Sequence, residues 1–192
     1  MPAGPSPAGA GGMPVASFLV DRHEVTNREY GAFMADGGYA TASLWPDSML
    51  MDGVTLARSA ALGRLVDATG AAGPRTWSGS VGPAGLADHP VSGVSWYEAR
   101  AYCLWQGKRL PTAAQWWRAA LGAGDQPFPW GGDTETLRAR ANLETSGTVV
   151  VESLPLGVSP FGAFEMAGNV REWLQPFSER TRLQSVTAYC LQ

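Results

Sequence analysis

Few residues in this chain have side chains suited to metal or nucleophilic chemistry. There are two histidines, His23 and His89, two cysteines, Cys103 and Cys190, and no C-x-x-C pair. Sites for zinc, copper or iron gather several imidazole and thiolate ligands, so we expect no histidine-based transition-metal site. Two cysteines cannot build a disulfide framework. We interpret both histidines as structural or surface residues.

Glu29 and Glu98 are candidates for general bases, but their spacing favours a structural role. Each stands three residues after a hydroxyl side chain, Thr26 or Ser95. This spacing is that of a capping box, in which the two side chains satisfy free amides at the start of a helix. The device recurs as T-x-x-Q directly after Pro111. We therefore interpret both glutamates as capping partners.

The three boxes predict three short helices. One runs from about 96 to 106 and is stopped by Gly107, which can adopt a left-handed conformation. Another covers about 113–121, and the third, which comes first in the chain, ends at Gly37. Cys103 lies on an apolar stripe of its helix, so we predict a buried cysteine that packs as a small hydrophobe.

Other segments give weaker patterns. Residues 1–14 are rich in Pro, Ala and Gly and predict a flexible N-terminus. A strand is predicted at 15–20, a helix at 55–68 and a short strand at 149–154. The tail 176–192 shows no clear period.

The composition is that of one loop-rich globular domain. The chain has 192 residues, 45% hydrophobic and 16% charged, with 24 Gly and 14 Pro. It also has eight tryptophans, and we interpret four of them as core and loop pins instead of a ligand cage: Trp96, Trp116, Trp117 and Trp173. These features predict an irregular α+β domain.

Charge and hydropathy exclude several partners. The net charge is −3 with no basic run, so nucleic acid is not expected. No apolar stretch approaches the roughly 20 residues that span a bilayer, so membrane insertion is not expected either. The N-terminus lacks the pattern of a secretory signal, which together with the few cysteines favours a cytoplasmic location.

Four blocks, in order along the chain, resemble the formylglycine-generating-enzyme, or sulfatase-modifying-factor, family. They are D-R-H-E-V-T-N-R-E-Y at 21–30, H-P-V-S-G-V-S-W-Y-E-A at 89–99, G-K-R-L-P-T-A-A-Q-W at 107–116, and F-P-W-G, A-N-L and S-P-F-G-A-F-E-M-A-G-N-V-R-E-W between 128 and 173. The resemblance covers roughly 15–175. The segment 36–77 most resembles versions attached to bacterial serine/threonine protein kinases.

The resemblance implies a C-type-lectin-like fold with sparse secondary structure and long loops. Known members include a copper-dependent oxidase that makes formylglycine, iron-dependent sulfoxide synthases, and domains on kinases without assigned chemistry. The oxidase binds copper with two cysteines in a region running from R-G-G-S-W to G-F-R, and neither motif is present here. Residues 187–190 are similar to the sequence around one copper cysteine, a match that we attribute to chance. The iron enzymes carry their histidine ligands in a separate helical domain, which this chain lacks.

We therefore do not expect copper, and we expect a domain at 15–175 whose C-terminal part is truncated, followed by an atypical tail at 176–192. The resemblance does imply structural calcium, a cation that prefers oxygen ligands. The first implied site uses two carboxylates and two backbone groups: Glu165, Gly168, Val170 and Glu172. The alternative for Glu172 is a solvent-facing carboxylate or an ion pair with Arg171 or Arg109.

A second implied calcium site begins at Asn142 and the Leu143 carbonyl, although its usual downstream Asp is missing. Our functional hypothesis is a family domain without oxidase chemistry. It would serve as a structural or ligand-binding module of a signalling protein, attached to or associated with a protein kinase, with an unknown protein or small ligand as partner. The alternatives are a truncated copy of a family enzyme and a lectin-like binder.

Overall fold

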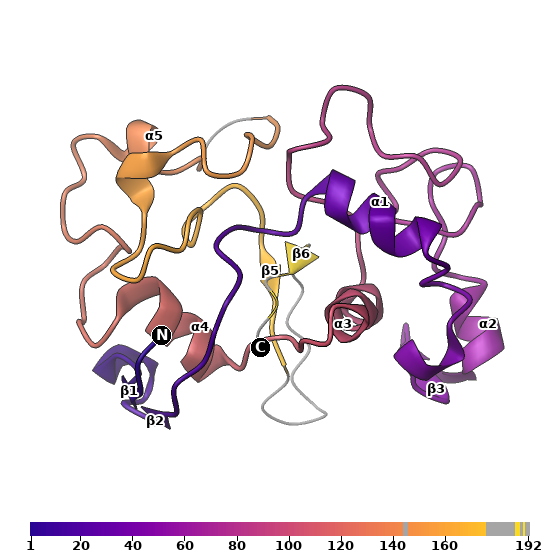
Figure 1. The fold of residues 1–192 in the computed structure, drawn as a ribbon, viewed down its shortest axis with the longest axis horizontal. Coiled ribbons are helices and arrows are strands. Elements are labelled where there is room, and N and C mark those ends of the chain that lie inside the picture. Colours follow the sequence, from indigo (N-terminus) through magenta and orange to yellow (C-terminus); the bar gives the residue numbers. More distant parts are fainter. Residues whose placement is uncertain (144–145, 176–186, 189, 191–192) are drawn as a thin grey trace.

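The computed structural model describes residues 1–143, 146–175, 187–188 and 190. Within this part of the chain, short elements are separated by long ordered loops (Figure 1). The helices are η1 (Ala8–Ala10), α1 (Asn27–Ala35), η2 (Ala42–Leu44), α2 (Arg58–Leu62), α3 (Trp96–Trp105), α4 (Ala113–Leu121), α5 (Leu137–Arg140) and η3 (Pro155–Gly157). The predicted α+β class is confirmed.

The strands form two-stranded sheets only, as far as the described residues show. β1 (Gly4–Pro5) pairs with β2 (Pro14–Val15) and β3 (Ser48–Met51) with β4 (Val54–Ala57), both antiparallel. β5 (Glu172–Trp173) and β6 (Thr187–Ala188) are parallel, with Glu172 opposite Thr187. In Figure 1 the β5–β6 pair lies centrally, between α4 on one side and α3 on the other.

All three predicted capping boxes are confirmed, and with them the three helices. Glu98 Oε2 accepts the Ser95 amide at 2.6 Å, and the boxes at Thr26 and Thr112 close in the same way. Gly107 has a φ of +70°, the left-handed value that the sequence predicts. Because each box satisfies its own helix start, these boundaries are fixed by local sequence.

Two apolar clusters build the core. The larger lies around α1 and α3, where Tyr30 stacks on Tyr102 with ring centroids 5.6 Å apart. The smaller joins α4 to the N-terminal segment through Val15 and Phe18. The indoles act as pins, since Trp96 Nε1 donates to the Leu174 carbonyl at 2.9 Å. Trp117, which is 40% exposed, is the exception.

Glu98 also has a second role, inside the core. Its Oε1 accepts the Tyr39 hydroxyl at 2.5 Å, and burial raises the pKa of Glu98. We expect Tyr39→Phe to destabilise the fold by about 1–3 kcal/mol in urea unfolding, because it leaves a buried carboxylate oxygen without a partner. Tyr97→Phe is the matched control, because the Tyr97 hydroxyl bonds the Leu50 amide at an exposed position. Equal losses in the two variants would contradict this role.

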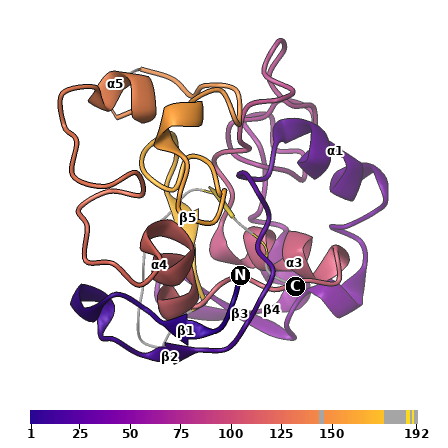
Figure 2. The same ribbon diagram turned by 60° about the vertical axis from the view of Figure 1, so that its left-hand side comes forward.

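The predicted flexible terminus 1–14 instead folds against α4. β1 and β2 pair, the Ser6 side chain is buried, and Arg118 Nη1 donates to the Pro5 carbonyl at 3.1 Å. Figure 2 shows this hairpin beside α4. The segment has few side chains to bury, but its backbone groups still find partners.

Three predicted elements differ in the structure. Of the strand predicted at 15–20, only Val15 is part of a strand, β2. The helix predicted at 55–68 begins as β4, because Asp52 and Gly53 adopt positive φ and turn the chain back on β3. No strand forms at 149–154, where the Val149 amide bonds a side chain, Asn169 Oδ1, at 2.9 Å.

Cys103 is buried in the core as predicted, but it is not a free cysteine. Cys103 and Cys190 are both fully buried and form a disulfide with a Cα–Cα distance of 5.4 Å. Their separation of 87 residues gives no local signal. Disulfides persist in oxidising compartments, so cysteine usage no longer favours a cytoplasmic location. Among the described residues, no helix is long and apolar enough to cross a bilayer.

Candidate functional site

Glu24 is a buried carboxylate that the sequence analysis missed. The residue is 0% exposed, and its Oε2 accepts Asn169 Nδ2 at 2.8 Å, while its Oε1 has no hydrogen-bond partner. Burial raises the pKa of Glu24 to about 9, and the negative charges of Glu172 and Glu165 act in the same direction. An acidic group with an unpaired oxygen away from water is costly unless a proton or a cation neutralises it.

Glu165, predicted as a calcium ligand, shares this environment. The residue is 3% exposed, its Oε2 accepts the Glu152 amide at 3.1 Å, and its Oε1 also lacks a hydrogen-bond partner. Burial raises the pKa of this carboxyl group as well. Its backbone has a φ of +49°, an unfavourable value for a residue with a side chain. Because Glu165 is buried, the loop holds its carboxylate facing inward.

Glu172 lies on β5 and is neither solvent-facing nor ion-paired in the described structure. Its Oε2 accepts the indole Nε1 of Trp116 at 2.6 Å. Burial raises the pKa of Glu172 to about 8. Arg109, the partner considered from the sequence, donates instead to Gln115 Oε1 at 3.1 Å. The alternative interpretation of Glu172 is therefore wrong.

Asn169 connects residues of the two calcium sites that the family resemblance implies separately. Its backbone amide donates to the Asn142 carbonyl at 2.8 Å, and its Oδ1 accepts Asn142 Nδ2 at 3.1 Å. Its own Nδ2 reaches Glu24, so one side chain links both predicted sites to the buried carboxylate. The backbone φ of +59° suits asparagine better than most residues. In the sequence, the Gly168-Asn169 pair was the one sign of a turn with positive φ at this position.

Gly168 is required at its position for space. A Cβ there would lie 2.7 Å from the Asn142 carbonyl oxygen, and its φ is +91°. The close approach brings the loop before β5 against the segment that starts at Asn142. The backbone carbonyls of Gly168 and Val170 remain the predicted ligands that would complement Glu165 and Glu172.

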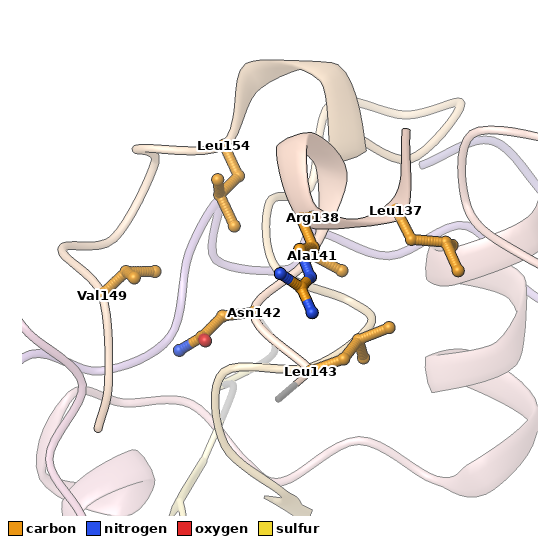
Figure 3. Close-up of a pocket in the computed structure, with 7 residues that line it drawn as sticks. All are labelled: Leu137, Arg138, Ala141, Asn142, Leu143, Val149 and Leu154. Carbon is orange, nitrogen blue, oxygen red and sulfur yellow. The ribbon is translucent and has the colours of Figure 1, made fainter. Parts of the chain in front are cut away.

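Asn142 and Leu143, predicted for the second site, line a small cavity of about 250 Å³. Figure 3 shows the Asn142 amide directed toward Val149, with Arg138 and Leu143 beside it. Most of its seven lining residues are apolar: Leu137, Arg138, Ala141, Asn142, Leu143, Val149 and Leu154. Asn142 Nδ2 donates to Gly147 and Asn169. Among described residues 146–151 no carboxylate follows, so this location is the poorer of the two for calcium.

We call Glu24, Glu165 and Glu172 the acidic cluster, because the negative charges of Glu172 and Glu165 both act on the buried Glu24 carboxyl group. Two buried carboxylate oxygens lack partners, and oxygen is the ligand type that calcium prefers. Within the described residues, no three His, Cys, Asp or Glu side chains are arranged as a ready metal site. A cation would therefore need backbone carbonyls to complete its ligands.

Comparison with known proteins defines the class. The model of the sulfatase-modifying factor enzyme 1-like domain matches residues 7–190, a longer range than the motifs cover. This chain belongs to that family. It is 36% identical over 160 residues to the serine/threonine-protein kinase Pkn1 of Chlamydia pneumoniae, covering 83% of this chain and 22% of the kinase.

Two further relatives carry enzyme names. A formylglycine-generating enzyme of Thermomonospora curvata is 35% identical over 189 residues, covering 83% of this chain and 59% of that protein. A hercynine oxygenase of Mycobacterium tuberculosis is 36% identical over 166 residues, covering 83% and 37% respectively. The chain thus spans less than two thirds of each of these relatives.

Proposed function

We propose that this family domain is a structural or ligand-binding module of a signalling protein, stabilised by a calcium ion at the acidic cluster. The observation that carries the proposal is the pair of buried carboxylate oxygens without partners, Glu24 Oε1 and Glu165 Oε1. A calcium ion would neutralise charge that burial otherwise opposes. Glu165, Glu172 and the carbonyls of Gly168 and Val170 would hold it.

The proposal assigns no copper-dependent oxidase chemistry to this chain. Copper(I) binding by two cysteines needs free thiolates. Here Cys103 and Cys190 are joined to each other, which supports a structural role for both sulfurs. We expect no formylglycine when the oxidised protein is incubated with copper and a cysteine-containing peptide. Its formation would favour the enzymatic alternative.

Attachment to a kinase is part of the proposal. Its support is the similarity to Pkn1 proteins of three Chlamydia species, in each of which the matching part is 22% of the protein. The C-type-lectin-like arrangement is also proposed, and is supported by the short sheets and long ordered loops around α1 and α3. Both proposals treat the domain as a module that presents loops on a rigid core.

Calorimetric titration of the chelator-treated protein tests the calcium proposal. We expect heat on adding calcium and an increase in the free energy of unfolding of about 2.7 kcal/mol at a hundredfold excess over Kd. Glu165→Gln should weaken binding at least about tenfold, whereas Glu135→Gln, at an exposed position, should not. No heat and no change in melting temperature would overturn the proposal.

A further inference from the structure

We propose that the Cys103–Cys190 disulfide is a positioning device for Glu172, so that breaking the bridge weakens cation binding at the acidic cluster. This inference rests on the proposed calcium function. Cys190 lies two residues after β6, and β6 pairs with β5 at Glu172 and Trp173. The bridge therefore ties the strand beside Glu172 to α3.

β5 and the two residues that follow it are attached to the core without help from the bridge. Trp173 Nε1 donates to the Val94 carbonyl at 2.9 Å, and Trp96 Nε1 donates to the Leu174 carbonyl at the same distance. The Gln175 amide donates to the Pro111 carbonyl at 2.7 Å. These contacts attach β5 to α3 and to the start of α4.

One edge of β5 is covered by β6, which has only two residues. A two-stranded pairing this short is marginal alone and needs an anchor. In the described structure β6 has its anchor at Cys190, through the disulfide and through the Asp21 amide, which donates to the Cys190 carbonyl at 3.1 Å. Without the bridge we expect β6 to separate and β5 to become an open edge.

Separation of β6 would act on the site through Glu172. Glu172 is half-buried, and Trp116 orients its carboxylate. Opening of the adjacent strand would let more water reach Glu172 and would loosen the β5 backbone that positions it. Groups that orient metal ligands typically change metal affinity by about 10–100-fold when they are lost.

Reduction is a balanced reaction with a dithiol. The dithiol transfers two electrons and two protons to the bridge. The Cys103–Cys190 S–S bond breaks to give two thiols, and the dithiol is oxidised to its own disulfide. Because both cysteines are fully buried, the variant Cys103→Ala with Cys190→Ala provides the unbridged state without reagent access. Val91→Ala is the matched control, because it removes buried volume from the same core cluster and leaves the bridge intact.

The experiment combines hydrogen exchange with calcium calorimetry on the full 192-residue chain, oxidised and unbridged. We expect amide exchange at β5 to accelerate at least about tenfold while α1 and α4 keep their protection. Calcium should bind about tenfold more weakly to the unbridged protein. Val91→Ala should lower the melting temperature and leave both readouts unchanged.

Three results would overturn the inference. Faster exchange at β5 with unchanged calcium affinity would show that the bridge does not act on the site, and unchanged exchange at β5 would show that it does not hold β6. Faster exchange in all helices would show that the bridge stabilises the whole fold and not β5 in particular. If even the oxidised protein binds no calcium, the calcium proposal fails instead, and exchange at β5 still decides whether the bridge positions the strand.

Discussion

Asn169→Ala is expected to destabilise the protein by about 3–5 kcal/mol, a large change for a single polar side chain. The substitution removes the hydrogen bond from the Asn169 side chain to Glu24 Oε2 and leaves the Val149 amide without its acceptor. Each buried polar group that loses its partner costs about 1–3 kcal/mol. Urea unfolding of wild type and variant measures the difference.

Two companion variants separate the backbone contribution from that of the side chain. Asn169→Gly relieves the positive φ but still lacks the side chain, so it should recover about 1 kcal/mol or less. Asn169→Asp keeps Oδ1 but places a second carboxyl group beside Glu24, so it should be strongly destabilised near pH 9, where Glu24 loses its proton and two acceptors face each other. Full recovery in the glycine variant would mean that the linking role of Asn169 is wrong.

Local chemistry explains what was predictable from the sequence. The helix starts at Thr26, Ser95 and Thr112 are encoded within four residues each, and the structure confirms them. The family blocks likewise assigned Glu165 and Glu172 to one implied calcium site. Calcium binding by these two residues stays a prediction.

Long-range pairing explains what was missed. In the sequence, Glu24 looks like one more surface glutamate. Its partner Asn169 lies 145 residues further along the chain, and only the tertiary fold brings the two side chains together. Cys190 likewise reaches Cys103 across 87 residues. The predicted tail 176–192 lies mostly outside the described residues, yet 187–188 pair with β5 and Cys190 joins the core. Such contacts depend on tertiary packing that no local period encodes.

The metal-free protein is expected to lose stability as pH rises from about 5 to 9. The pKa of Glu24 is about 9 in the folded protein and near 4.5 when unfolded, so the folded state holds its proton more tightly. The resulting stabilisation is fully present below the unfolded value and is lost as pH rises through the folded one. Each pKa unit corresponds to about 1.4 kcal/mol, so the decline is on the order of several kcal/mol.

Glu24→Gln identifies the group responsible for this decline. The amide cannot ionise, so urea unfolding between pH 6 and 9 in the presence of chelator should give a flatter profile, with the variant more stable than wild type near pH 9. Glu172→Gln should flatten the profile less, because the pKa of Glu172 is raised only to about 8. The exposed Glu135→Gln variant should run parallel to wild type.

Calcium should reverse the trend, because a bound cation favours the ionised carboxylates and competes with protons for them. Wild-type stability measured in excess calcium should therefore hold or rise between pH 6 and 9, while without calcium it falls. A metal-free profile that is flat in wild type, or equally steep in Glu24→Gln, would remove Glu24 as the titrating group. A steep metal-free profile that calcium leaves unchanged would keep Glu24 as a buried acid and argue against a cation beside it.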